Sequence, residues 1–162
     1  MGATTLYNFR TKVVDWTPSL NTDTHAAGDV VAAFEEVALS EGGTATRPLR
    51  GTINYAIVHD AGAVGAQFDI LISDDSTVAM GGAESAAAAI TDAHAKTILG
   101  VIDTSATWAT VGSTGKFAKP AAFVPIPFEL LGDSLYMGII ARASWNVDAA
   151  TDITVRFGLT IE

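Results

Sequence analysis

The sequence predicts an all-β fold, an antiparallel two-sheet β-sandwich with one short helix, and three observations favour it. Residues 152–162 carry an apolar side chain at every odd position and a polar residue or glycine at every even one, as half-buried strands do. About eight strand candidates of this kind are separated by turn-forming residues. They do not alternate with helices in the rhythm of a parallel sheet. A jelly roll is one form that such a sandwich takes.

The first half of the chain supplies four expected strands, over residues 11–16, 30–34, 50–60 and 67–73. The segment 19–29 between the first two is dense in turn formers. Residues 50–60 are the candidate for a central strand, with Ile53, Tyr55 and Ile57 on one face and Asn54, Ala56 and Val58 on the other. In residues 67–73, Phe68, Ile70 and Ile72 are expected to point inward.

The helix is expected within the alanine-rich residues 83–96, where Thr91 is placed to cap a short helix over residues 92–96. Residues 98–102 are continuously apolar and short, which favours a buried strand. Residues 123–128 are expected at a sheet edge, because Pro125 and Pro127 have no N–H to donate to a ladder.

The last two strands are expected to form an antiparallel hairpin. Residues 134–143 place Leu135, Met137, Ile139 and Ala141 on one face, and residues 144–151 would turn the chain back into the terminal strand. The inward set of that terminal strand is Ile153, Val155, Phe157, Leu159 and Ile161.

The 162 residues suffice for one domain, since a chain of this size buries roughly two-thirds of its unfolded surface. We assign residues 1–12 to an N-terminal arm and residues 13–162 to a single β-sandwich domain. The chain has no cysteine, which excludes disulfides, a thiolate nucleophile and cysteine-ligated zinc.

Charge and hydropathy restrict the partners. Eighteen acidic and nine basic residues give a net charge of −9, and the basic residues are scattered, which argues against a nucleic acid. No signal peptide and no run of roughly 20 apolar residues is present, so we expect a soluble protein without a membrane partner. Hydrophobic residues make up 49% and charged residues 17%, which indicates surfaces that become covered.

No motif for catalysis or cofactor binding withstands inspection, and we expect a non-enzymatic protein without cofactor or metal. His25, His59 and His94 lack the spacing of a metal motif, and no Gly-x-Ser-x-Gly elbow is present. Residues 112–117 resemble a phosphate-binding loop, but the glycine spacing is wrong and Phe117 replaces the magnesium-binding hydroxyl.

Two further sets of residues have a binding interpretation beside a structural one. Asp74, Asp75, Asp148 and Asp152 could ligate calcium, but aspartate is intrinsically favoured in turns. Trp16, Trp108 and Trp145 could stack on a sugar, but tryptophan usually packs in a core or an interface.

Arg142 and Arg156 are expected on outward faces. There they pair with carboxylates of the same chain or with carboxylates across an interface, and pairing within the chain is favoured.

Several segments, in their order, resemble a family of small virion structural proteins of tailed bacteriophages. They are residues 28–30, 65–74, 91–93, 98–102 and 126–128, and then residues 134–143 followed by 152–159, which resemble the C-terminal hairpin of that family. The similarity covers residues 22–161. This chain departs from the family at the alanine-rich residues 83–90 and at the arm, residues 2–10.

The resemblance implies a virion component on the capsid exterior, made in the host cytoplasm. A head decoration or cement protein that binds the major capsid protein, as a homotrimer, is the first hypothesis. A tail or neck protein and a carbohydrate-binding module remain as alternatives. The residues expected at interfaces are Leu6, Tyr7, Phe9, Arg10, Arg142, Trp145 and Arg156.

Overall fold

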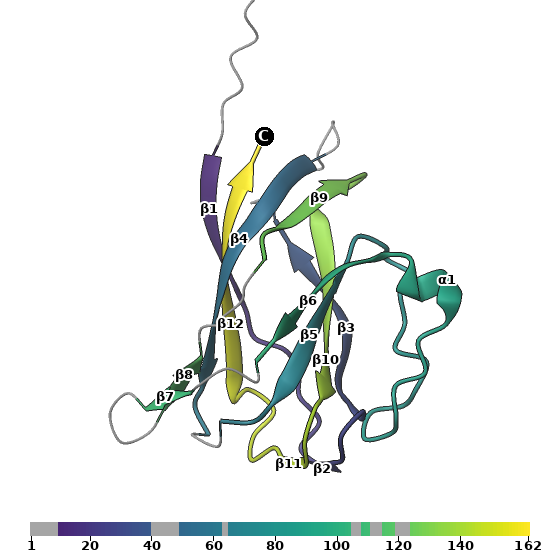
Figure 1. The fold of residues 1–162 in the computed structure, drawn as a ribbon, viewed down its shortest axis with the longest axis vertical. Helices are drawn as coiled ribbons and strands as arrows, with labels where there is room; N and C mark the ends of the chain where they lie inside the picture. Colours follow the sequence, from purple (N-terminus) through teal and green to yellow (C-terminus); the bar gives the residue numbers. More distant parts are fainter. Residues whose placement is uncertain (1–9, 40–48, 63–64, 105–107, 111–114, 119–123) are drawn as a thin grey trace, which may run out of the picture.

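The protein is an antiparallel β-sandwich with one short helix, as the sequence predicts (Figure 1). This computed structural model describes residues 10–39, 49–62, 65–104, 108–110, 115–118 and 124–162. The elements are β1 (Arg10–Trp16), β2 (Thr24–His25), β3 (Val30–Ala38), β4 (Leu49–Asp60), β5 (Phe68–Ser73), α1 (Asp92–Ala95), β6 (Ile98–Asp103), β7 (Ala109–Thr110), β8 (Lys116–Ala118), β9 (Ile126–Leu130), β10 (Ser134–Ala141), β11 (Trp145–Asn146) and β12 (Ile153–Ile161).

The two main sheets differ in their number of strands. The six-stranded sheet runs β1-β12-β4-β8-β7, with β9 also paired to β4, and the four-stranded sheet runs β3-β10-β5-β6. β4 is central, as expected, because β12 pairs along one of its edges and β8 and β9 share the other. The small pair of β2 and β11 lies at one end of the sandwich (Figure 1).

The strand order is that of a jelly roll. Of the ten strands in the two sheets, all but the short β7 and β8 form this order: β1, β3, β4, β5, β6, β9, β10 and β12. Among these eight strands the first and last along the chain, β1 and β12, pair with each other. Inside them β3 pairs with β10, β4 with β9 and β5 with β6, and all four pairs are antiparallel. Such nested antiparallel pairs, wound into two facing sheets, define the jelly-roll architecture.

The expected hairpin between the last two strands is wrong. β10 pairs with β3 and β5, whereas β12 pairs with β1 and β4, so the turn after β10 carries the chain into the opposite sheet. Within that turn β11 pairs with β2. In a jelly roll each late strand completes a pair begun near the N-terminus, so consecutive strands need not be neighbours.

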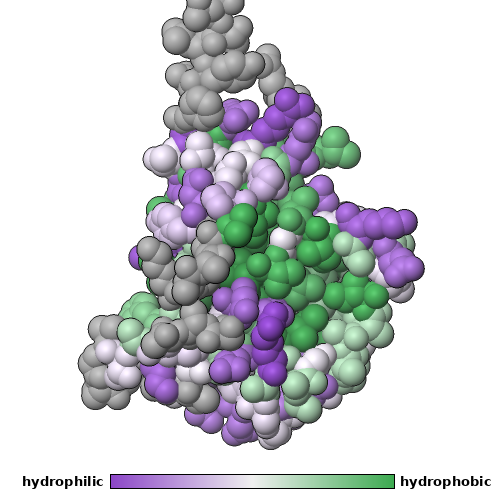
Figure 2. Space-filling model, viewed as in Figure 1, coloured by the Kyte–Doolittle hydropathy of each residue, from purple (hydrophilic) through white to green (hydrophobic). Residues whose placement is uncertain are grey.

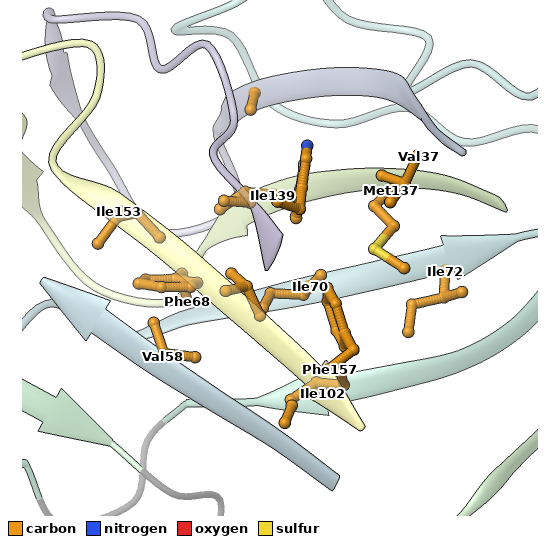
Figure 3. Packing of buried hydrophobic residues seen from close by; sticks show 14 of the residues in the cluster. Val37, Val58, Phe68, Ile70, Ile72, Ile102, Met137, Ile139, Ile153 and Phe157 are labelled. Carbon is orange, nitrogen blue, oxygen red and sulfur yellow. The ribbon is translucent and has the colours of Figure 1, made fainter. Parts of the chain in front are cut away.

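The core lies between the two sheets and is built from the alternating residues. The inward sets expected for β5 and β10 are confirmed, and so is that of β12 except for Ile161, which is partly buried against the core. Figure 3 shows side chains from both sheets meeting in this layer, including Phe68, Met137 and Phe157, all at most 1% exposed. This packing decides which face of each strand remains for contacts outside the molecule.

A β-bulge changes the faces of the central strand. Ile53 points into the core, but beyond Asn54 it is Ala56 and Val58 that are buried, while Tyr55 and Ile57 face outward. The register between β12 and β4 shifts at this point, between Gly158 and Leu159. One extra residue reverses the alternation that follows it, so Ile53 does not share a face with Tyr55 and Ile57 as expected.

Residues 74–91 cover the outer side of β3, and this segment contains no helix. Within the alanine-rich residues 83–96 only α1 forms, after that segment, with the Thr91 side chain capping it at His94 N, as expected. The remainder is tied to β3 by hydrogen bonds from Val30 N to Ala86 O at 2.9 Å and from Ser85 N to Val30 O at 3.0 Å. The edge of β3 therefore overrides the helix propensity of alanine.

β6 is an edge strand rather than the buried strand expected for residues 98–102. It pairs only with β5 among the described residues, and Val101 is 51% exposed. β9 forms the proline-containing edge that was expected, since Pro127 lies opposite Thr52 of β4. The short apolar run of β6 thus predicted a strand correctly but not its burial, because burial depends on how many strands pair with it.

Candidate interaction surface

The outer face of the six-stranded sheet is the strongest candidate for a functional surface, and we call it the β4 face. It consists of Val13, Asp15, Tyr55, Ile57, His59, Phe117, Thr154 and Arg156. Val13 is 55% exposed, and Tyr55, Ile57, His59 and Phe117 are half-buried. The four-stranded sheet has residues 74–91 over its outer side, whereas this face holds apolar and aromatic side chains open to solvent.

The register places these side chains in rows across the strands. Tyr55 lies opposite Gly158, and a side chain at Gly158 would overlap the tyrosine ring, so the ring rests across that glycine. Ile57 lies opposite Arg156, which in turn lies opposite Asp15 of β1. His59 faces Phe117 of β8, with ring centroids 4.5 Å apart. A shallow cleft of about 370 Å³ is bordered by Asp15, Ile57, His59, Phe117, Thr154 and Arg156.

An arginine–carboxylate pair on this face joins β12 to the edge strand β1. Arg156 donates from Nε to Asp15 Oδ1 at 2.7 Å and from Nη2 to Asp15 Oδ2 at 2.8 Å, a bidentate geometry. These hydrogen bonds, together with the positive charge of Arg156, hold the pKa of Asp15 below its usual range. The same hydrogen bonds and the negative charge of Asp15 raise the pKa of Arg156. The intramolecular pairing favoured for Arg156 is confirmed.

This pair makes the titration of Asp15 a direct test of the geometry. The carboxyl of Asp15 is expected to titrate below the ordinary value of about 3.9 in NMR, and its midpoint should rise towards that value in Arg156→Gln. Because the folded-state pKa is depressed, the pair contributes stability above the unfolded pKa and loses it as the pH falls through the folded one.

Arg50→Gln is the matched control for that titration, because Arg50 pairs with Glu129 elsewhere on the surface. It should leave the Asp15 midpoint in place. An Asp15 midpoint that is the same with and without Arg156 would contradict the assigned hydrogen bonds.

Comparisons with known proteins give no family for this chain. No protein-family model matches it, and no curated protein is significantly similar to it. The likeness of its segments to phage virion proteins therefore stays a prediction from the sequence.

The structure distributes the expected interface residues over different places. Arg156 lies on the β4 face, whereas Arg142 follows β10 on the other sheet, where its Nε donates to Asp69 Oδ1 at 2.6 Å. Arg10 is exposed at the start of β1, so the sheet begins inside the segment assigned to the arm. Leu6, Tyr7 and Phe9 lie outside the described residues.

Trp145 was wrongly placed at an interface, because its side chain is 3% exposed and stacks on Phe68 with centroids 5.2 Å apart. Trp16 is 5% exposed, and Trp108 is partly buried against the core. Core packing is thus confirmed for these tryptophans, and an exposed tryptophan platform for sugars is not present among the described residues.

The candidate metal ligands have structural roles. Asp75 accepts hydrogen bonds from the backbone N and hydroxyl of Thr77, which lower its pKa, and Asp152 accepts one from Ala149 N. Within the described ranges no group of three histidine or acidic side chains could hold a metal ion. No described helix is both long and apolar enough to cross a membrane.

The histidines follow the expected structural roles in part. His59 lies near the end of β4 and His94 on α1, as expected. His25 was expected in a loop but lies in β2, 1% exposed, with Nε2 at 3.1 Å from Asn21 O. Sequence reasoning found Arg156 but missed Tyr55, Ile57, His59 and Phe117. The available signal was that residues 50–60 are apolar on both faces, which is unusual for an antiparallel strand with one face in water.

Proposed function

We propose that this chain is a non-enzymatic structural protein of a tailed bacteriophage, a head decoration or cement protein that binds the major capsid protein. The observation that carries the proposal is the β4 face, a broad sheet surface on which Val13 is exposed and Tyr55, Ile57 and Phe117 are half-buried. A flat surface with aromatic side chains near its centre is suited to adhesion rather than to enclosing a substrate. The resemblance of the chain to virion proteins supplies the kind of partner.

The proposed setting is the capsid exterior, reached after synthesis in the host cytoplasm. A homotrimer would bring three β4 faces to one site on the shell, and linked contacts raise the effective concentration of each subunit by orders of magnitude. Each face would then need only modest affinity. Neither a nucleic acid nor a membrane is a partner in this proposal, in keeping with the net charge of −9.

Cryo-electron microscopy and mass spectrometry of purified phage particles test the location. The expected result is many copies arrayed over the capsid shell. A few copies at the tail or neck would replace the proposal by the alternative virion position, and particles without this protein would overturn both.

Substitutions on the β4 face test the surface itself. We expect Ile57→Lys and Phe117→Ala to weaken binding to assembled shells at least tenfold, about 1.4 kcal/mol, because both remove apolar area from the middle of the contact. Co-sedimentation with shells measures the effect. Ala83→Lys, an exposed position in the segment that covers the other sheet, is the control and should bind normally. Equal binding by all variants would exclude the β4 face.

Carbohydrate binding is the second candidate, and the cleft on the same face favours it. Aromatic rings of His59 and Phe117 lie beside the polar groups of Asp15, Thr154 and Arg156, a combination that can hold a sugar ring. A glycan array tests it. Glycan binding that is lost in Phe117→Ala, with shell binding unchanged, would favour this function over decoration.

A further inference from the structure

The edge of β6 has backbone groups that no described strand uses. β6 is the last strand of the four-stranded sheet, and Thr104 N donates to Phe68 O of β5 at 3.0 Å. Antiparallel ladders alternate, so Ile102 also directs its N–H and C=O towards β5, whereas Val101 directs both away from it. The edge therefore presents a donor and an acceptor at Val101.

An apolar stripe on the outer side of the sheet leads to the same residue. Val101 lies opposite Leu71, which is 7% exposed, and Leu71 lies opposite Gly138 of β10. The Met80 side chain occupies the place where a side chain at Gly138 would lie. Figure 2 shows hydrophobic residues gathered over β5 and β6 on this face. The stripe is buried at Leu71 and Met80 but remains 51% exposed at Val101.

β6 lacks two kinds of residue that commonly protect an edge, its register shift against β5 is confined to the end next to Ser73, and its surroundings are acidic. Ile98–Asp103 contains neither lysine nor proline, which natural edge strands use to prevent pairing. At one end Asp69 and Asp103 lie 2.6 and 3.9 Å from Arg142. At the other end Asp74 and Glu129 border a cleft of about 450 Å³ together with Leu99 and Arg50. An apolar strand with positive charge would complement this edge.

We propose that the edge of β6 accepts residues 4–9 of a second copy of this chain as an added strand. The segment Thr4-Thr5-Leu6-Tyr7-Asn8-Phe9 is rich in strand-forming residues and carries no charge and no proline. Residues 1–14 contain no acidic residue, whereas Arg10 and Lys12 are basic, so this segment is positive in an otherwise acidic sequence. Main-chain hydrogen bonds would give affinity, and an alternate side chain would cover Val101.

The exchange gives each copy one donated strand and one accepting edge. Such a contact joins two different surfaces, so it closes into a ring when the rotation between copies permits. The exchange would supply the homotrimer of the proposed function, but it does not depend on binding to the capsid shell, because neither surface belongs to the β4 face. A negative result on the strand exchange would not bear on shell binding through the β4 face, which is a separate proposal with its own test.

Sedimentation equilibrium of the full chain and three variants tests the exchange. The full chain is expected to sediment as a closed oligomer, and a chain lacking residues 1–9 and the Val101→Lys variant as monomers of about 16 to 17 kDa. Val13→Lys is the matched control, because Val13 is equally exposed but lies on the β4 face, and it should remain oligomeric. Circular dichroism checks that each variant keeps its strands.

A synthetic peptide of residues 1–14 added to the shortened chain provides a second readout. Hydrogen exchange is expected to slow at the Val101 amide when the peptide binds, and raised salt should weaken that binding. A monomeric full chain, an oligomer that survives removal of residues 1–9, or peptide protection away from β6 would each overturn the proposal.

Discussion

Phe157→Ala is expected to destabilise the protein by about 3–5 kcal/mol, the cost of removing a large aromatic side chain from a core. Phe157 is fully buried and points from β12 into the layer between the sheets (Figure 3). Its strand pairs with both β1 and β4, so relaxation around the cavity would have to move the middle of the six-stranded sheet. For a domain of this length the loss corresponds to a melting temperature lower by roughly 6–20 °C.

Urea unfolding followed by tryptophan fluorescence measures this effect, since Trp16 and Trp145 are buried and report on the core. Phe117→Ala is the matched control, because it removes the same atoms from the half-buried outer face, where less area is lost and no closed cavity forms. Its cost should stay near 1 kcal/mol, as at other positions outside the core. Equal losses at the two positions would mean that the assigned core side of β12 is wrong.

The strands that sequence reasoning placed best are those with one buried face. In β5 and β10 the alternation identifies the inward side chains without knowledge of the neighbours. The alternation does not identify the strand that a given strand pairs with. β12, for example, pairs with β1, at the other end of the chain. A period of two residues specifies a face but not a neighbour, and this is why the expected terminal hairpin failed.

The bulge at Asn54 shows a second limit of the pattern. Residues 50–60 are apolar on both faces of the expected strand, so nothing in the sequence marks the residue that loses its partner. The shift places Tyr55 and Ile57 outside and so creates the β4 face. Arg156 was identifiable in advance because it stands alone among apolar neighbours, whereas Phe117 joined this face only through the pairing of β8 with β4.

Gly51→Ala is expected to cost at least about 1–3 kcal/mol, because the backbone of β12 occupies the space that a side chain at residue 51 would need. A Cβ atom there would overlap the Thr160 carbonyl oxygen and would lie 2.7 Å from Cζ of Phe128. Gly51 lies opposite Ile161 on one side and Phe128 on the other, so neither neighbouring strand can move away without losing its own ladder. The close approach is between main chains, which a change of rotamer cannot relieve.

Gly132→Ala gives the opposite expectation and serves as the control in the same urea titration. No atom lies within 4 Å of the place where its Cβ would be, and its backbone is outside the left-handed region. The alanine should therefore leave the folded state unchanged and restrict the unfolded chain, which stabilises proteins by up to about 1 kcal/mol. The two substitutions add the same methyl group, so a difference in sign isolates the contact between β4 and β12. Equal unfolding midpoints would mean that Gly51 tolerates a side chain and that β12 does not approach β4 as closely as the register requires.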